Sequence, residues 1–244
     1  MSASARDALA WAADVPLSEA RALYAKLQPF IGVVKVGLSL FVEHGPEALE
    51  AFRGQGARLF LDLKLHDIPN TVELAAARAA ALGVSYLTVH ASGGGAMLRA
   101  AIQGAQTGAA ASGKPAPQLL AVTALTSLDD AAVQSLGFAA SAAALANRLA
   151  RLAVDSGVQG LVCSAHELKA LRAAYPGLVL CTPGIRPAGA APGDQARTET
   201  PEGAVRAGSD LLVVGRPLHA STDALAAAKA LHAAVASALA EAKR

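Results

Sequence analysis

The chain is poor in charged and aromatic residues. Of its 244 residues, 16% are charged and 4% are aromatic, and 21 Lys and Arg nearly balance 19 Asp and Glu. The formal net charge is +2, and no block of consecutive basic residues occurs. Nucleic-acid-binding domains usually combine such a basic block with aromatic side chains. The composition therefore argues against a nucleic-acid partner.

Cysteine and long apolar runs are also scarce. The two cysteines, Cys163 and Cys181, each lie in an apolar run, which predicts buried, reduced thiols and not a disulfide or a metal pair. No uninterrupted apolar run is long enough to span a membrane. Arg6, Asp7 and Asp14 flank the N-terminal apolar run, which makes it a poor signal peptide. We expect a cytoplasmic protein with no membrane partner.

The chain does contain a regular alternation of short apolar runs and longer Ala- and Leu-rich stretches. Most of the apolar runs are continuous, as in strands of parallel sheets that are covered on both faces. They predict strands at Ala8–Ala13, Val33–Val36, Arg58–Leu63, Tyr86–His90, Gln118–Ala124, Gly160–Cys163, Leu178–Cys181 and Leu211–Val214. Helical patterns lie between them, for example at Ser18–Gln28, Thr71–Leu82, Ser141–Ser156 and Asp223–Ala240.

This alternation predicts the fold. Eight strands over the chain give about 30 residues per strand–helix unit, which is the spacing of a (β/α)8 barrel. No linker or second compositional region is visible. We therefore predict one α/β domain over residues 1–244, a (β/α)8 TIM barrel. A doubly wound open sheet is the alternative, because one miscounted strand would change the architecture.

Two segments have little periodicity. Gly104–Pro117 is rich in Gly, Ala and Pro and is predicted to be a flexible surface connection. Pro183–Pro201 follows the seventh predicted strand and is long for a loop inside a compact domain, which is typical of functional lids. It carries polar side chains that a disordered insert would not need: Arg186, Asp194, Gln195 and Arg197.

The densest charge lies where the third predicted strand should end, in Asp62–Thr71. Asp62, Lys64 and Asp67 follow the apolar run Leu59–Leu61 closely. Charged groups this near a core perturb one another's ionisation, and such clusters concentrate in active sites. A buried salt bridge that fixes the strand end is the alternative. Two acids against one base, however, leave a negative charge that a substrate or partner would explain.

Periodicity and proline placement add detail to this segment. Residues two apart in a strand face the same side, so Asp62 and Lys64 are expected to point together. Pro69 restricts the residue before it to an extended backbone, and Asn70 or Thr71 can then cap the next helix. The last aspartate of the cluster would lie on a projecting turn that could reach a neighbouring subunit.

In barrels of this kind the working residues lie at the carboxyl ends of the strands. The polar residues at those predicted ends are Asp14, Lys35, Asp62, Lys64, His90, Thr123, Thr126, Arg186 and Arg216. The last two loops carry a glycine near an arginine, in the place where such barrels usually bind phosphate. Glycine lets backbone N–H groups approach an anion, and arginine donates in a fork, so we predict a phosphate site. Surface arginines at loop ends are the alternative.

The remaining signals are weaker. Gly93–Gly95 lacks a dinucleotide fingerprint and is predicted to be a tight strand-to-helix turn. His90 is predicted to be a hydrogen-bonded structural histidine. We predict no required metal, because metal-ligand spacing is missing among His44, His66, His219 and His232.

The segment Asp62–Thr71 closely resembles the Asp-x-Lys-x-x-Asp-Ile-Pro-Asn-Thr signature of the orotidine 5′-phosphate decarboxylase family. Other segments agree with that family in order: Ala13–Pro16, Lys35–Gly37, Val89–Gly94, Val122–Ser127, Val162–Ala165, Thr182–Pro187, Asp194–Arg197 and Val214–Pro217. The resemblance covers essentially the whole chain. It implies a homodimeric barrel that converts orotidine 5′-phosphate to UMP and CO₂ without cofactor or metal.

The resemblance also implies roles for particular residues. Lys64 would donate a proton to C6 of the pyrimidine, Asp62 would lie beside the leaving carboxylate, and Asp67 would complete the charged array from the other subunit. The implied substrate-binding residues are Asp14 and Lys35 at the ribose, Asn70, Thr71 reaching across the dimer, Thr126 and Ser127 near the pyrimidine, and Arg186, Gln195, Gly215 and Arg216 at the phosphate. Each site would then be built from both chains.

Two other functions stay open at this point. A related barrel enzyme that acts on a sugar phosphate would use a similar Asp-x-Lys-x-x-Asp array with a metal, but the Ile-Pro-Asn-Thr continuation argues against it. A non-catalytic nucleotide-binding or scaffold protein could share the fold, because fold alone does not fix function. The intact set of charged residues argues against this second alternative.

Overall fold

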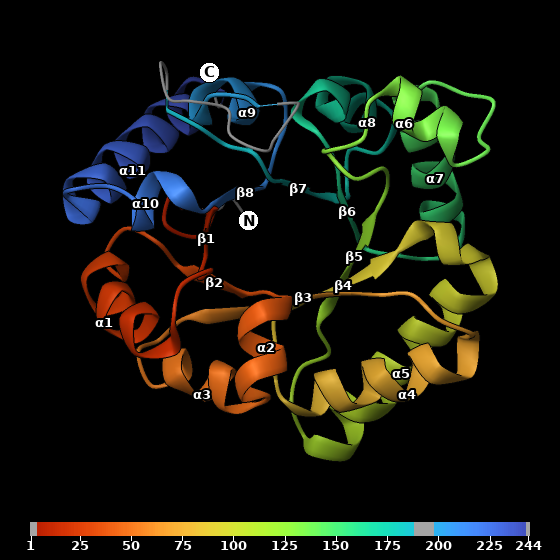
Figure 1. Cartoon of the computed structure of the whole chain (residues 1–244), viewed down its shortest axis with the longest axis horizontal. Helices are drawn as coiled ribbons and strands as arrows, with labels where there is room; N and C mark the ends of the chain where they lie inside the picture. The colour runs from red at the N-terminus through yellow and green to blue at the C-terminus, as the bar shows by residue number, and fades with distance from the viewer. Residues whose placement is uncertain (1–3, 188–197, 243–244) are drawn as a thin grey trace.

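The computed structural model describes residues 4–187 and 198–242, and its centre is a closed barrel of parallel strands (Figure 1). The strands are β1 (Leu9–Ala12), β2 (Val33–Val36), β3 (Arg58–Leu65), β4 (Tyr86–His90), β5 (Gln118–Val122), β6 (Gly160–Val162), β7 (Val179–Thr182) and β8 (Leu211–Val214). Each strand pairs with the next along the chain, and Leu9 of β1 pairs with Leu212 of β8 to close the ring. The predicted (β/α)8 barrel is confirmed, and the open doubly wound sheet is excluded.

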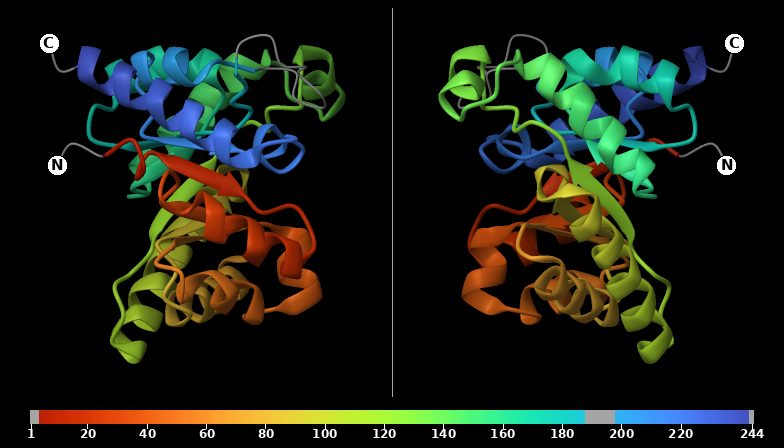
Figure 2. Two further views of the ribbon diagram at one scale, coloured as in Figure 1. Left: turned by 90° about the vertical axis from the view of Figure 1, so that its left-hand side faces the viewer. Right: turned by 90° about the vertical axis from the view of Figure 1, so that its right-hand side faces the viewer.

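Helices surround the barrel. They are α1 (Leu17–Leu27), α2 (Leu38–His44), α3 (Glu47–Arg53), α4 (Pro69–Ala81), α5 (Gly94–Ser112), α6 (Asp130–Ser135), α7 (Ala142–Asp155), α8 (Leu168–Ala174), α9 (Pro201–Arg206), α10 (Arg216–His219) and α11 (Ala224–Glu241), with 3₁₀ turns η1 (Ala91–Gly93) and η2 (Ala165–Glu167). Helices α1 to α5 cover one half of the barrel, and the later helices cover the other half (Figure 2). The four helical segments named from the sequence correspond to α1, α4, α7 and α11, so those predictions are confirmed.

Two layers of apolar side chains stabilise the barrel. Successive strand residues point to opposite faces. Phe60 and Tyr86 therefore pack together inside the barrel, whereas Leu61 and Leu87 face the surrounding helices. Full burial of one such side chain stabilises the fold by roughly 1.5–3 kcal/mol. The apolar interior fills the barrel beneath the polar residues at the strand ends.

Helices α4 and α5 approach each other very closely. A Cβ atom added to Gly104 would lie 2.0 Å from the carbonyl oxygen of Glu73, and one on Gly108 would lie 2.0 Å from that of Ala77. Only glycine permits this approach of two backbones. The prediction that Gly104–Pro117 is a flexible surface connection is wrong, because α5 runs through most of it. Its small residues serve helix packing and not chain flexibility.

Helix α4 begins earlier than its predicted caps. Ile68 is the N-cap, with φ −58° and ψ 152°, the extended backbone expected before proline. Pro69 is the first helical residue, where its missing N–H removes no helical hydrogen bond. The prediction that Asn70 or Thr71 caps the helix is wrong, because both lie within its first turn and no side chain caps it.

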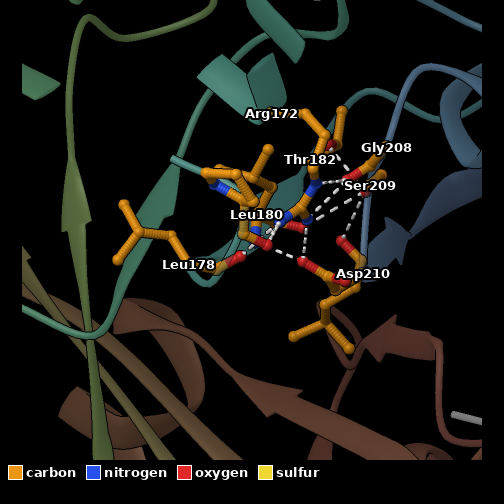
Figure 3. A network of polar contacts seen from close by, with 9 residues as sticks. Arg172, Leu178, Leu180, Thr182, Gly208, Ser209 and Asp210 are labelled. Carbon is orange, nitrogen blue, oxygen red and sulfur yellow. Dashed lines mark hydrogen bonds and ion pairs between the residues drawn. The ribbon is translucent and has the colours of Figure 1, made fainter. Parts of the chain in front are cut away.

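The amino-terminal ends of β7 and β8 are joined by a network centred on Arg172 of α8 (Figure 3). Its guanidinium group donates to the carbonyl oxygens of Leu178 (2.9 Å) and Gly208 (2.7 Å) and to the carboxylate of Asp210. Asp210 also accepts a hydrogen bond of 2.8 Å from the N–H of Leu180. The network lies at the end of the barrel away from the carboxyl ends of the strands, so its role is structural.

Helix α11 is long and apolar enough to cross a membrane by length and composition, and it is the one such helix among the described residues. Its side chains Leu231 and Val235 are buried against the barrel core. Packing of one helix face on the sheet is typical of the outer helices of such barrels.

Candidate active site

A cavity of about 560 Å³ opens at the carboxyl ends of the strands. This is the end at which barrel enzymes carry their active sites, and the volume suits a small molecule. The predicted site residues that line it are Asp14, Lys35, Asp62, Lys64, Thr126, Ser127, Arg186, Gly215 and Arg216. Phe60 adds apolar surface from the barrel interior. The fold thus brings together residues that lie far apart in the sequence.

Four charged side chains form a row of alternating sign in this cavity. The Lys64 Nζ atom lies 2.8 Å from Oδ1 of Asp62 and 2.9 Å from Oδ2. On the other side of the same carboxylate, Lys35 Nζ lies 3.3 Å from Asp62 Oδ2. Lys35 Nζ also lies 4.0 Å from Oδ1 of Asp14. The order follows the barrel, because β1, β2 and β3 are neighbours and each contributes from its carboxyl end.

Asp62 is held as a carboxylate between two ammonium groups. Burial alone would raise its pKa, but the charges of Lys35 and Lys64 and hydrogen bonds from Lys64 and Thr88 outweigh burial and lower the pKa. The argument from sequence that two acids face one base is wrong here, because Lys35 joins the cluster from β2. The row within one chain has two positive and two negative side chains, so its charges balance without Asp67, the second aspartate of the signature.

Lys64 has an unusual backbone conformation. Its φ is +51°, and it is the one non-glycine residue with positive φ in the described part of the chain. The pairing register of β3 with β4 shifts between Leu61 and Leu65, around this residue. Bulges of this kind re-aim side chains and recur next to active sites. The Asp62 and Lys64 side chains meet as predicted, but through an irregular strand and not a regular one.

Thr88 of β4 is a site residue that the sequence argument missed. Its fully buried hydroxyl accepts a hydrogen bond from the Lys64 N–H at 2.8 Å and donates one to Asp62 Oδ1 at 2.9 Å. The period of two along a strand puts Thr88 on the same face as His90, which was noted as a polar strand-end residue. That period could have identified it.

The glycine and arginine residues of the last two loops line the same cavity. Arg186 is buried and donates to the carbonyl oxygen of Ile185 at 3.2 Å, and Gly184 before them has φ +78°, which favours glycine. Gly215 is the N-cap of α10, and Arg216 is its first residue. Both arginines therefore lie on the wall of one cavity.

The predicted lid Pro183–Pro201 is partly described. Its two ends are joined by an isolated bridge between Ile185 and Glu199, and the Arg186 N–H donates to the Glu199 carbonyl oxygen at 2.9 Å. The polar residues of this segment that lie outside the described residues are Asp194, Gln195 and Arg197. The phosphate role of Gln195 therefore stays a prediction.

Three predicted site residues are exposed and lie outside the cavity of their own chain: Asp67, Asn70 and Thr71. The Asp67 carboxylate accepts a hydrogen bond of 2.7 Å from the N–H of Ile68, which holds the turn. The side chain of Ile68 is 66% exposed. This exposed position agrees with the predicted projecting turn.

The histidines near the site differ from one another. His219 lines the cavity, although the sequence analysis predicted no role for it. Its buried Nδ1 atom has no hydrogen-bond partner among residues 4–187 and 198–242. Burial lowers its pKa, against a raising effect of the Asp14 and Glu19 charges. The ring of His90 lies 5.3 Å from that of His66.

Among the described residues, no cluster of His, Cys, Asp and Glu has the arrangement of a metal site.

Both cysteines are buried, as predicted. Cys181 lines the cavity, and burial raises the pKa of its thiol well above the ordinary value. A thiol in this state is protonated and behaves as a small apolar group. Cys181 therefore forms part of the cavity wall.

Fold and site together define a (β/α)8-barrel protein with a cavity lined by charged side chains at the carboxyl ends of its strands. The chain matches the family model "Orotidine 5'-phosphate decarboxylase / HUMPS family" over residues 7–231, and it belongs to that family. It is 53% identical over 224 residues to orotidine 5′-phosphate decarboxylase of Anaeromyxobacter sp. (strain K), an alignment that covers 91% of this chain and 95% of the relative. The enzyme of that name from Thermobifida fusca (strain YX) is 48% identical over 92% of this chain and 94% of its own length. The crystal structure of orotidine 5′-phosphate decarboxylase from Lactobacillus acidophilus superposes with a TM-score of 0.80 at 35% identity, covering 93% of this chain and 98% of that one.

Proposed function

We propose that this protein decarboxylates orotidine 5′-phosphate to UMP and CO₂, the last step of pyrimidine nucleotide synthesis, without a cofactor or metal. The observation that carries the proposal is the row of alternating charges that ends at Lys64, in a cavity also lined by Arg186 and Arg216. The two relatives compared above, at 53% and 48% identity, are named for this reaction. A cytoplasmic location, with no nucleic-acid or membrane partner, is part of the proposal.

Lys64 is the proton donor. Cleavage of the bond between C6 and the carboxyl carbon releases CO₂ and leaves the bonding electron pair on C6. The Lys64 ammonium stabilises this negative charge and then transfers a proton to it, which forms the C6–H bond of UMP. The ionised Asp62 beside it favours the charged form of the amine, so the proton is in place before the bond breaks.

Asp62 has a second role at the leaving group. Its carboxylate faces the carboxylate of the substrate, and the two like charges repel. Departure of neutral CO₂ relieves this repulsion, whereas the preorganised lysines remain to stabilise the new charge on C6. Asp67 of a second chain completes the charged array.

The rest of the cavity holds the substrate. In the proposal, Asp14 and Lys35 bind the ribose hydroxyls, Thr126 and Ser127 lie near the pyrimidine, and Arg186, Gln195, Gly215 and Arg216 bind the phosphate, with Asn70 and Thr71 supplied by the partner. The phosphate lies remote from the bond that breaks. Its binding energy can therefore favour the transition state at the other end of the substrate.

We further propose a homodimer with shared active sites. Asp67, Asn70 and Thr71 are exposed outside the cavity of their own chain, where they are available to another. Exposed apolar side chains lie on or next to α2 and α4, which start at the ends of the adjacent strands β2 and β3: Leu38 (54%), Val42 (82%), Ile68 (66%) and Leu74 (58%). Exposed apolar side chains that follow two neighbouring strands are suited to cover by a second copy.

The activity is tested by following the absorbance of orotidine 5′-phosphate in metal-free buffer that contains a chelator. We expect absorbance to fall as UMP forms, at a rate that the chelator does not change. Loss of activity with chelator and recovery with a divalent cation would favour a metal-dependent sugar-phosphate enzyme. Binding of UMP without release of CO₂ from the substrate would favour a non-catalytic binding protein.

The shared site is tested by mixing two inactive variants. Lys64→Ala lacks the proton donor, and Asp67→Asn lacks the residue given to the partner. In a random mixture of dimers, roughly a quarter of the sites are intact, because each mixed dimer has one site with both native residues. Recovery of that fraction of activity supports the shared site, whereas no recovery between two variants shown to exchange subunits contradicts it.

A further inference from the structure

Thr88 lies opposite an interruption in the pairing of β3 with β4. The regular pairs on either side of it are Leu61 with Leu87 and Leu65 with Val89. The stretch Asp62–Lys64 of β3 therefore faces the single residue Thr88 of β4. This arrangement is a bulge of β3 that contains Asp62 and Lys64, two of the four charged residues of the row.

The hydroxyl of Thr88 bonds to both ends of this bulge. The backbone N–H of Lys64 can only donate, so Oγ1 of Thr88 is the acceptor in their 2.8 Å hydrogen bond. The hydroxyl proton is then directed to Asp62 Oδ1, at 2.9 Å, which as a carboxylate can only accept. The Thr88 side chain has an exposure of 0%, so water does not compete for either bond.

The bond to Lys64 supports a backbone conformation that is unfavourable by itself. With φ at +51°, Lys64 occupies the left-handed region, which L-residues other than glycine rarely adopt. Residues held in such regions persist only when their surroundings fix them. The hydrogen bond from the Lys64 N–H to Thr88 supplies this fixation at the strand interruption.

We propose that Thr88 is a positioning residue for the reaction, whose hydroxyl holds the Asp62–Lys64 bulge so that the ammonium group of Lys64 points at the reacting carbon. Thr88 does not line the cavity and acts through its two partners. The catalytic part of this inference rests on the proposed decarboxylase function. The geometric part is that the Thr88 hydroxyl holds the Asp62 carboxylate by a hydrogen bond, and this part does not depend on the reaction.

The test compares Thr88→Val, which keeps the shape but lacks the hydroxyl, with Thr88→Ser, which keeps the hydroxyl. We expect Thr88→Val to lower kcat about 100-fold with little change in KM, because a proton donor displaced by about 1 Å loses this much. Thr88→Ser should retain most of kcat. A kcat for Thr88→Val within a few fold of wild type, or an equal loss in both variants, would overturn the proposal. If Thr88→Val does not fold, Thr88→Ala takes its place with the same expectation.

A matched control separates positioning from stability. Thr182 of β7 is also fully buried, its hydroxyl bonds to Ser209 at 2.8 Å, and neither residue lines the cavity. Thr182→Val should lower the melting temperature without lowering kcat of the folded protein. Equal losses of kcat in Thr182→Val and Thr88→Val would assign the effect of Thr88 to general destabilisation.

A measurement that needs no turnover keeps this proposal distinct from the proposed function. In a ¹³C NMR titration, the Asp62 carboxyl of Thr88→Val should titrate at higher pH than that of wild type, because a hydrogen bond to the charged form is lost. If the wild-type protein proved inactive, the proposed function would be contradicted. The shift between Thr88→Val and wild type would still support the geometric inference. An unchanged Asp62 titration would contradict the inference whatever the activity.

Discussion

The ammonium group of Lys35 lies 3.3 Å from Oδ2 of Asp62, on the neighbouring strand of the barrel. Lys35 pairs in register with Phe60, two residues before Asp62, so the pairing of β2 with β3 sets this distance. Asp62 is therefore shared between Lys35 and Lys64, and the closed sheet itself holds the charges in order. The proposed proton transfer from Lys64 depends on this arrangement.

The pH dependence of stability tests the state of Asp62. Its pKa in the folded protein is lowered, so its ionisation favours folding above the unfolded-state pKa, about 3.9, and this contribution is lost as pH falls through the folded-state pKa. The free energy of unfolding of wild type minus that of Asp62→Asn should thus be constant above about pH 5. Below that pH the difference should fall, because wild type loses stability that the variant does not have. Urea unfolding across this range measures it. A difference that moves in favour of wild type on acidification would contradict the lowered pKa.

The close packing of α4 on α5 predicts that Gly104→Ala destabilises the protein. In an open helix this substitution would be favourable, but here the new Cβ would lie 2.0 Å from the Glu73 carbonyl oxygen. We expect a loss of about 1–3 kcal/mol in the free energy of unfolding. Gly54→Ala is the control, because no atom lies within 4 Å of its added Cβ, and it should be neutral or slightly stabilising. Equal effects of the two variants would contradict the packing interpretation.

The network at the amino-terminal ends of β7 and β8 predicts a stability effect without a catalytic one. Arg172→Met removes hydrogen bonds to Leu178, Gly208 and Asp210 and should lower the free energy of unfolding by about 2 kcal/mol. Arg206→Met breaks an exposed ion pair and should cost less than about 0.5 kcal/mol. Denaturant melts and kcat of the folded protein check both. A lowered kcat in folded Arg172→Met would contradict the purely structural role.

The barrel could be predicted from the sequence because its strands are continuous apolar runs, which few other structures require. The close approach of Gly104 to the backbone of α4 could not be predicted, because a stripe of small residues has the same composition in a loop and in a tightly packed helix. The role of Thr88 depends on a shift of register, and the contribution of Lys35 depends on which strands are neighbours. Neither feature can be predicted from the local sequence of Asp62–Thr71. The family signature identified the charged residues but not what holds them.

The phosphate assignment predicts the effect of Arg216→Ala. Loss of one charge-assisted hydrogen bond to the phosphate should raise KM for orotidine 5′-phosphate by about 10- to 100-fold. Any turnover of orotidine, which lacks the phosphate, should be the same in the variant and in wild type. Steady-state kinetics with both compounds check this, and an unaltered catalytic efficiency with the phosphorylated substrate would contradict the assignment.

The central claim is that Lys64 protonates the carbon that CO₂ leaves. Its most direct test is the kcat of Lys64→Ala with saturating orotidine 5′-phosphate in chelator, beside a measurement of UMP binding that shows an intact site. The account predicts a loss of at least about 1,000-fold in kcat, because both charge stabilisation and proton transfer are removed. A variant that still forms UMP at a near-normal rate would contradict it.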